Sequence, residues 1–312
     1  MAIQWYPGHM HKAQKEIAEV MPQVDLVIEV LDARIPYSSE NPMVSSLRGD
    51  KPCIKLLNKS DLADPVVTQQ WIEYLEQEQG VKAMAITTLQ AAQVKKIPDL
   101  CRKFVPSRDK IEKDIRTMIM GIPNVGKSTI INTLAGRTIA KTGNEPAVTK
   151  VQQRINLRNG IVLSDTPGIL WPKVDNDKSS YRLAVTGAIK DTAMDYEDVA
   201  MFAAEYFLAA YPEAIKERYK LKELPDTDIE LLEAIGRQRG AMRPGGRIDL
   251  HKASELVLHE FRSGKMGLLS LETPAMAEVE KVEVAKIMAE KEAKKKARKE
   301  NEALKRAGKR HK

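Results

Sequence analysis

The sequence is poor in cysteine and in aromatic residues. Its 312 residues include only two cysteines, Cys53 and Cys101, which lie in apolar or amphipathic stretches without metal-like spacing. This argues against a disulfide framework and a zinc site, and it favours a reducing compartment, so we expect the cytoplasm. Aromatic residues make up 5% of the chain, and no aromatic RNA-binding signature of the RRM kind is present.

Long apolar runs are also absent. No stretch approaches the roughly 20 apolar residues that a membrane span needs. Residues 1–24 contain no arginine and no apolar run of signal-peptide length. We therefore expect a soluble protein without a membrane partner. The sequence does not give the oligomeric state, and we take a monomer.

The net charge of +7 comes mainly from one end of the chain. Residues 276–312 hold 13 Lys or Arg and 7 Glu, so the residues before them are nearly neutral. Such a tail is typical of a solvated helix or a disordered arm, and equally of an arm that contacts RNA. Composition leaves both interpretations open.

The first half of the chain alternates between two patterns. Short runs rich in Val, Ile and Leu indicate strands at 25–31, 52–57, 82–86, 116–121 and 161–164, and helical patterns occupy 66–79, 91–104 and 127–135. This alternation predicts an α/β fold with a mostly parallel sheet and helices on both faces. Ligand-binding loops then lie at the carboxyl ends of the strands.

The strand pattern ends near Trp171, and helices follow. Asp249 is a plausible cap for a helix with Ala253, Leu256, Val257 and Phe261 on one face, and Gly264 lies just past its end. We expect three regions: a nucleotide-binding domain at 1–172, a small helical domain at 173–272, and a basic, helix-prone extension with little core at 273–312.

A phosphate-binding loop lies between an expected strand and an expected helix. Gly121 to Ser128 fits the pattern G-x-x-x-x-G-K-S in that context. Backbone N–H groups of such a loop hold phosphates, Lys127 reaches the β and γ oxygens, and the Ser128 hydroxyl binds Mg²⁺. The expected phosphate contacts are Asn124, Val125, Gly126, Lys127, Ser128 and Thr129.

A second loop supplies a metal-binding carboxylate. Asp165 ends the strand at 161–164, where it can hold Mg²⁺, and the N–H of Gly168 can sense a γ-phosphate. Thr149 lies between this loop and the phosphate loop, where a switch threonine would close on Mg²⁺. An ordinary loop threonine is the alternative for Thr149.

A third loop selects the base. Asn58, Lys59 and Asp61 form the pattern N-K-x-D after the strand at 52–57. A carboxylate at Asp61 can accept from both N1–H and the 2-amino group of guanine, and adenine offers no such pair of donors. Thr87 and Thr88 stand where a backbone N–H to guanine O6 is expected, although Ser-Ala-Lys is more usual there. Together the loops predict a GTP site.

The order of these loops is rotated, because the guanine loop comes first and the phosphate loop second. The chain resembles the circularly permuted GTPases, and most closely the ribosome biogenesis GTPase A family. The resemblance covers about residues 1–272. It rests on five loops in rotated order, the three above with those of Thr149 and Thr87-Thr88, and on the following segments: Trp5 to Met10, Asp32-Ala33-Arg34-Ile35-Pro36, Asp165 to Pro172, Gly187 to Lys190, and Phe261 to Lys265.

The resemblance implies further roles. Asn124 resembles an asparagine that helps to hold K⁺ against the phosphates in potassium-dependent GTPases, and a solvent-facing asparagine is the alternative. The resemblance implies three catalytic residues, namely His9, Lys127 and Thr149. A structural or RNA-contacting histidine is an equally open interpretation of His9. Ile169 occupies the place of the usual water-orienting glutamine, so intrinsic turnover should be slow, on the order of 10⁻⁴ to 10⁻² s⁻¹.

The implied function is assembly of the large ribosomal subunit. Such a GTPase binds a precursor particle and its rRNA in the GTP state and leaves after hydrolysis. The sequence alone leaves two other functions open. One is a GTP-dependent regulatory switch that binds a protein partner and has no ribosomal role, and the other is an RNA chaperone in which hydrolysis is incidental.

Overall fold

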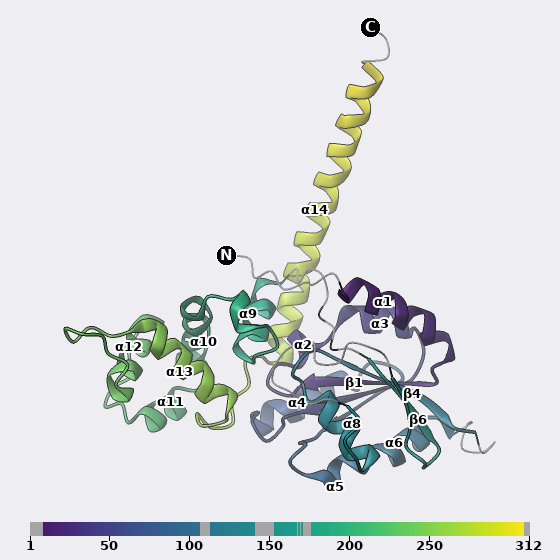
Figure 1. Cartoon of the computed structure of the whole chain (residues 1–312). Coiled ribbons are helices and arrows are strands. Elements are labelled where there is room, and N and C mark those ends of the chain that lie inside the picture. The colour runs from purple at the N-terminus through teal and green to yellow at the C-terminus, as the bar shows by residue number, and fades with distance from the viewer. Residues whose placement is uncertain are drawn as a thin grey trace.

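The computed structural model describes residues 9–106, 113–140, 153–166, 168, 170 and 176–308. Within these ranges it describes side chains except at 9–14, 153 and 297–308. Figure 1 shows a sheet with helices around it, a group of helices beside it, and the long helix α14 pointing away from both. No helix among the described residues is long and apolar enough to cross a membrane.

A six-stranded sheet forms the centre of the first part, in the order β3-β2-β1-β4-β6-β5. All neighbours are parallel except β5 and β6. The strands are β1 (Leu26–Asp32), β2 (Cys53–Asn58), β3 (Val81–Ala85), β4 (Ile115–Gly121), β5 (Gln153–Asn156) and β6 (Ile161–Asp165). Every residue of β1 and β2 is buried, as expected of parallel strands covered on both faces.

The strand pairing reveals how the rotated chain closes its sheet. The central strand β4 pairs with β1, the first strand of the chain, through the register Val30 to Gly121. On its other side β4 pairs with β6, where Ile119 lies opposite Asp165. The loops after β1, β2, β3, β4 and β6 therefore lie along one edge of the sheet. The predicted fold, a permuted P-loop GTPase domain followed by helices, is confirmed.

Most of the helices near the sheet follow the expected pattern. They are α1 (His9–Val20), η1 (Met21–Gln23), α2 (Pro36–Ser39), α3 (Pro42–Arg48), α4 (Pro65–Leu75), α5 (Ala91–Val94), α6 (Ile97–Phe104) and α8 (Lys127–Ala135). Asp64 starts α4 because its carboxylate accepts from the N–H groups of Val66 and Val67. The prediction of a single helix at 91–104 is wrong, because two helices, α5 and α6, occupy this range. Pro98 cannot continue a helix that began at Ala91 and instead lies in the first turn of α6.

The second part is helical. It comprises α9 (Asp177–Val185), η2 (Asp191–Ala193), α10 (Tyr196–Ala210), α11 (Pro212–Tyr219), α12 (Asp228–Arg239) and α13 (Leu250–Arg262). Asp249 caps α13 as expected, and the apolar face of α13 packs Phe261 against Phe207 with 5.5 Å between ring centroids. Leu256 is only half-buried.

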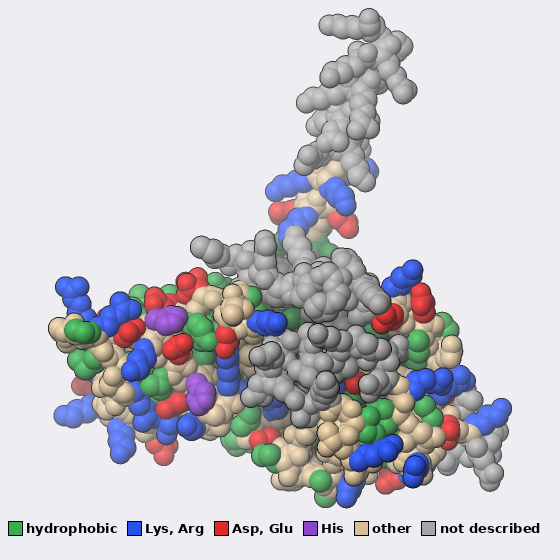
Figure 2. Space-filling model, viewed as in Figure 1, with side chains coloured by type: hydrophobic (Ala, Val, Ile, Leu, Met, Phe, Trp, Pro, Cys, Tyr) green, Lys and Arg blue, Asp and Glu red, His purple; other side chains and the backbone are tan. Residues whose placement is uncertain are grey.

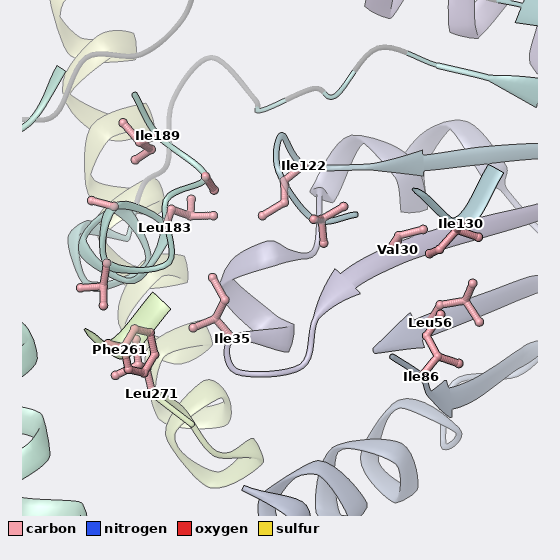
Figure 3. Close-up of a cluster of buried hydrophobic side chains, with 14 of the residues drawn as sticks. Val30, Ile35, Leu56, Ile86, Ile122, Ile130, Leu183, Ile189, Phe261 and Leu271 are labelled. Carbon is pink, nitrogen blue, oxygen red and sulfur yellow. The ribbon is translucent and has the colours of Figure 1, made fainter. Parts of the chain in front are cut away.

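The two parts share one hydrophobic core. Figure 3 shows Ile35, which follows the sheet strand β1, facing Leu183 of α9 and Phe261 of α13. Ile122 of the phosphate loop and Ile189 of the helical part belong to the same buried cluster. The helical part is therefore packed against the loops at the ligand-binding edge of the sheet.

The root of α14 (Pro274–Gly308) is also buried. Ala277 is 1% exposed and lies in a cluster with Trp71 of α4. Glu280 is 3% exposed although it is charged. The extension therefore has more core than its composition predicts, because its first turns pack on the sheet domain.

A buried ionic network ties this root to α9. The guanidinium of Arg182 donates to both carboxylate oxygens of Glu280 (2.9 and 2.7 Å) and to Glu272 (3.2 Å). Glu272 also accepts from the N–H of Ser38 (2.9 Å), and its carbonyl accepts from the Trp71 indole (3.1 Å). Burial raises the pKa of Glu272, and the positive charge of Arg182 opposes that rise. One cation thus compensates two buried carboxylates.

Arg182→Met should lower the free energy of unfolding by about 3–5 kcal/mol, because two buried carboxylates lose their cation. The loss should shrink as the pH falls from 8 to 5. Removal of the cation raises the pKa of Glu272 further and raises the pKa of Glu280 from its lowered value, so protonation at lower pH relieves the penalty. Urea unfolding at the two pH values measures both effects.

Lys178→Met is the matched control. Lys178 and Glu283 form an exposed ion pair between the same two helices, with both side chains 54% exposed. Its loss should cost less than about 1 kcal/mol. Equal losses in the two variants would contradict a stabilising role for the buried network.

Candidate functional site

The predicted guanine loop and phosphate loop are joined by a buried hydrogen bond. Asn58, fully buried at the end of β2, donates from Nδ2 to the carbonyl oxygen of Val125 at 2.7 Å. The Oδ1 atom of Asn58 has no hydrogen-bond partner in the described residues. The bond fixes the distance between the two loops, so one ligand can contact both.

The phosphate loop has the backbone shape that anion binding requires. Asn124 and Gly126 have left-handed φ angles of 58° and 96°. A Cβ atom at Gly126 would lie 2.2 Å from Nδ2 of Asn58, so only glycine fits there. The helix α8 begins at Lys127, directly after this turn, and its first N–H groups are directed toward the loop.

The predicted lysine and metal-binding carboxylate meet beneath this loop. Lys127 Nζ lies 3.0 Å from Oδ1 of Asp165, and both side chains are buried. Burial raises the pKa of Asp165, and the charge of Lys127 opposes the rise. The second oxygen, Oδ2, is buried with no hydrogen-bond partner among the described residues. An unsatisfied carboxylate oxygen on the residue that pairs with Lys127, next to Ser128 in the chain, fits a divalent cation with oxygen ligands.

The loop after β6, which carries Gly168, touches the phosphate loop. A Cβ atom at Gly168 would lie 3.0 Å from Cα of Pro123, tighter than an ordinary contact. Glycine therefore allows the two backbones to approach each other. The hydroxyl of Thr166 donates to the carbonyl of Ile119 at 2.9 Å and holds the start of the loop on β4. A group that binds to the phosphate loop would thus lie near Gly168.

The loop after β3 also joins the site. Ser60 donates to the carbonyl of Ile86 from both its backbone N–H (3.1 Å) and its hydroxyl (2.9 Å). Thr87 donates its N–H to Gln93, and half-buried Thr88 lies near Gly126. Asp61 is half-buried on the same guanine loop. The elements expected to surround a guanine base are therefore brought together.

A charged cluster lies behind the guanine loop, and local sequence patterns did not predict it. Asp32 at the end of β1 accepts from Lys59 Nζ (3.0 Å) and from Arg34 Nε (2.9 Å) and Nη2 (2.7 Å). Burial opposes ionisation of Asp32, but the charges of Arg34 and Lys59 outweigh it and hold its pKa well below the usual range. The Arg34 guanidinium lies over the ring of Phe261 at 5.0 Å. The only sequence signal was the Asp-Ala-Arg segment after β1.

The phosphate loop is also bound to the helical part. Asn124 Nδ2 donates to the carbonyl of Gly187 at 2.9 Å, so Asn124 is not the solvent-facing residue that one interpretation expected. Arg262 of α13 donates to the carbonyls of Val185 (2.9 Å) and Ala184 (2.8 Å) and thereby caps α9 just before Gly187. The position of α9 is therefore linked to the phosphate loop.

A cavity of about 820 Å³ lies between the two parts at this contact. Its lining includes Arg34, Lys59, Asn124, Gly187, Lys190 and Arg262. The cavity adjoins the guanine loop at Lys59 and the phosphate loop at Asn124. Its cations are partly compensated, because Arg34 and Lys59 pair with Asp32 and Arg262 pairs with Asp191. A ligand that contacts both loops would border this cavity.

Three predicted residues fall outside this description. Thr149 and Ile169 lie outside the described residues, and His9 is described only as the first backbone position of α1. Their expected roles in metal binding and catalysis stay predictions. The other predicted residues lie on loops at one edge of the sheet.

Comparison with known proteins confirms the fold and the family that the sequence predicts. The family model described as 50S ribosome-binding GTPase matches residues 116–234. The match starts at β4 and leaves out the guanine loop at Asn58, which precedes it in this chain. Ribosome biogenesis GTPase A of Priestia megaterium is 49% identical over 286 residues, covering 89% of this chain and 99% of that protein. Its counterpart in Thermotoga maritima is 33% identical, covering 87% and 95%.

Two solved structures have the same architecture. They are GDP-bound TM YlqF (TM-score 0.60, 28% identity, covering 83% of this chain and 99% of that one) and GNP-bound YlqF from Thermotoga maritima (TM-score 0.59, 28% identity, covering 84% and 98%). Each alignment spans nearly all of the solved chain but only 83–84% of this one, so this chain is longer than either.

Asp61→Asn should weaken GTP binding about 10- to 100-fold, because the replacement amide cannot accept from both guanine donors and loses a charge-assisted hydrogen bond. Xanthosine triphosphate should become the better ligand, since xanthine carries a carbonyl where guanine has its 2-amino group. Isothermal titration with both nucleotides measures the change.

Asp50→Asn is the control, because Asp50 is an exposed carboxylate after α3. It should leave both affinities unchanged. If Asp61→Asn binds GTP as tightly as the original chain, Asp61 does not select the base.

Proposed function

We propose that this chain, which belongs to the ribosome biogenesis GTPase A family, binds a precursor of the large ribosomal subunit in its GTP state and leaves after hydrolysis. The chain is a GTP-hydrolysing enzyme with a P-loop GTPase domain. The observation that carries the proposal is the bond from Asn58 to Val125, which unites the guanine and phosphate loops of this family in one site.

The guanine contacts in this proposal follow the site geometry. Asp61 accepts from the base, and Asn58 holds the phosphate loop in register with it. The N–H of Thr87 is already bound to Gln93, so the N–H of Thr88 is the better donor to guanine O6. Lys59 is held behind the guanine loop by Asp32.

The phosphate contacts come from the loop before α8. Backbone N–H groups from Val125 to Thr129 bind the β-phosphate region, which suits the left-handed turn at Gly126. Lys127 exchanges its pairing with Asp165 for the β and γ oxygens. The N–H of Gly168 responds to the γ-phosphate because this glycine lies against Pro123.

Metal ions complete the site in this proposal. Asp165, Ser128 and Thr149 would hold Mg²⁺, and the unpartnered Oδ2 of Asp165 supports that assignment. When bound, Mg²⁺ neutralises charge on the phosphates. Asn124 would hold K⁺, and its hydrogen bond to the carbonyl of Gly187 supports this role because it fixes the amide in the phosphate loop.

Hydrolysis is slow until a partner assists it. Ile169 cannot orient water, so His9 takes part in that role once the particle has bound. His9 begins α1, close in sequence to Ile17 and Met21, which are buried against the sheet. Because α1 is anchored, His9 can reach only a limited region. In this proposal the ribosomal partner moves His9 into position to orient the water.

The helical part transmits the nucleotide state. Asn176 lies only eight residues after the phosphate-sensing position at Gly168. It caps α9 and also donates to Glu280 of α14. A change in that loop therefore acts on α9 and on its contact with the phosphate loop. In this proposal the chain has three regions, at 1–172, 173–272 and 273–312, and the helical region contacts rRNA. The protein acts in the cytoplasm as a monomer.

Sedimentation with ribosomal particles tests the function. With a non-hydrolysable GTP analogue the protein should cosediment with large-subunit precursors, and with GDP it should remain at the top of the gradient. The reason is that only the γ-phosphate orders the loop at Gly168. Equal cosedimentation with both nucleotides, or none with either, would contradict the proposal and favour a switch that binds a protein.

The Asp61→Asn variant supplies an internal control. It should lose cosedimentation with the GTP analogue and regain it with the corresponding xanthosine analogue. Recovery shows that the nucleotide, and not general adhesion of a basic protein, determines binding.

A further inference from the structure

The distal part of α14 extends beyond the folded body. Figure 1 shows the helix leaving the body beside α2 and α9, with its far end away from every other element. All side chains from Ala285 to Lys296 are exposed. At about 1.5 Å per residue, the stretch from Ala285 to Gly308 adds about 35 Å of reach. Packing against the body does not account for this part of the helix.

Charge is divided unevenly along α14 and the residues after it. Residues 278–292 hold five Glu and three Lys, whereas residues 294–312 hold ten Lys or Arg and only two Glu. We call residues 294–306 the basic arm. The helix dipole favours cations only in the last turn, near Gly308. It therefore does not explain Lys294, Lys295 and Lys296, which lie more than two turns earlier.

The first lysines of the basic arm have no neutralising carboxylate among the described side chains. Lys294, Lys295 and Lys296 are exposed and form no ion pair among the described residues. Closer to the root, Lys281 pairs with Glu278 at 3.2 Å. Figure 2 shows that both signs of charge mix around the described stretch of α14 near the body. The lysines without an ion pair among the described residues follow this stretch along the helix.

The root fixes the direction of the basic arm. Glu280 is held by Arg182, and Ala277 is buried against α4. The ammonium of Lys281 lies over the rings of Tyr74 (5.0 Å) and Tyr37 (5.8 Å). These contacts join the helix to the GTPase domain, so the positive charge is presented at a defined place relative to the nucleotide site.

The composition of the basic arm favours a partner recognised by charge. The apolar residues of the basic arm are Ala297, Ala303 and Leu304, and the exposed Ile287 and Met288 lie before it. A coiled-coil partner needs larger apolar residues at repeating positions, and a membrane surface needs an apolar face that inserts. A single leucine in the basic arm supplies neither feature, whereas a phosphate backbone needs only accessible Lys and Arg.

We propose that the basic arm binds the phosphate backbone of structured RNA, at a point separate from the contacts of the GTPase and helical domains. This inference rests on the proposed function, since the RNA of a ribosomal precursor is the polyanion within reach. Contacts of this kind position a protein without reading sequence. The basic arm therefore strengthens and orients binding and takes no part in GTP hydrolysis.

The test replaces five charges in the full-length protein: Lys294→Gln, Lys295→Gln, Lys296→Gln, Arg298→Gln and Lys299→Gln. Glutamine has nearly the helix propensity of lysine, so α14 should persist. Binding to precursor particles is measured with the GTP analogue across a salt series. Each phosphate contact contributes about 0.7–0.9 to the slope of log K against log salt, so the slope should fall by about 2–4. GTP turnover without particles should not change.

The control exchanges the same lysines for arginine and Arg298 for lysine, which keeps the charge. Its slope should match that of the original chain. An unchanged slope in the glutamine variant, with nucleotide-dependent binding intact, would overturn the role of the basic arm and leave the proposed function standing.

A second measurement is independent of the ribosomal function. Fluorescence anisotropy with a labelled RNA duplex of arbitrary sequence compares the original chain and the glutamine variant at low salt. The variant should bind at least about tenfold more weakly, since it lacks five of the charges that would contact phosphates. Equal affinities would overturn the proposal even if no precursor particle bound the protein at all.

Discussion

The hydrogen bond from Asn58 to the carbonyl of Val125 is the contact on which the nucleotide site depends. It joins a loop from the first part of the chain to one that lies 67 residues further along. In the rotated order these loops meet only because β1 pairs with β4 in the middle of the sheet. Gly126 must be glycine for the bond to form, since a Cβ atom there would displace the Asn58 amide. In the proposed function, base selection and phosphate binding therefore both depend on this one strand pairing.

The same rotation determines how the site acts on the rest of the molecule. Among the described residues, the next element after Asp165 is α9. Two further contacts link α9 to its surroundings: Asn124 to Gly187, just after the end of α9, and Arg182 to Glu280 at the root of α14. A change in the phosphate-sensing loop therefore has direct routes to the helical part and to α14. The central claim of this account is that the nucleotide state sets the position of the helical part.

Local patterns in the sequence predicted much of the sheet and the nucleotide loops. Five strands lie within one residue of their predicted bounds, because buried parallel strands are continuous apolar runs. The edge strand β5 was missed, since its four residues Gln153–Asn156 are mostly polar. The clusters around Asp32 and Arg182 were also missed. Periodicity assigns charged residues to the surface, whereas these are buried because partners distant in sequence, such as Lys59 and Glu280, neutralise them.

The distance between the GTPase and helical parts in the two nucleotide states tests the central claim most directly. Spin labels at Gln70→Cys on α4 and Gln238→Cys on α12 occupy exposed positions, while the native Cys53 and Cys101 are buried and should not react. Double electron–electron resonance then compares the protein with GDP and with a non-hydrolysable GTP analogue. The account predicts two different distance distributions. The same distribution in both states would contradict it.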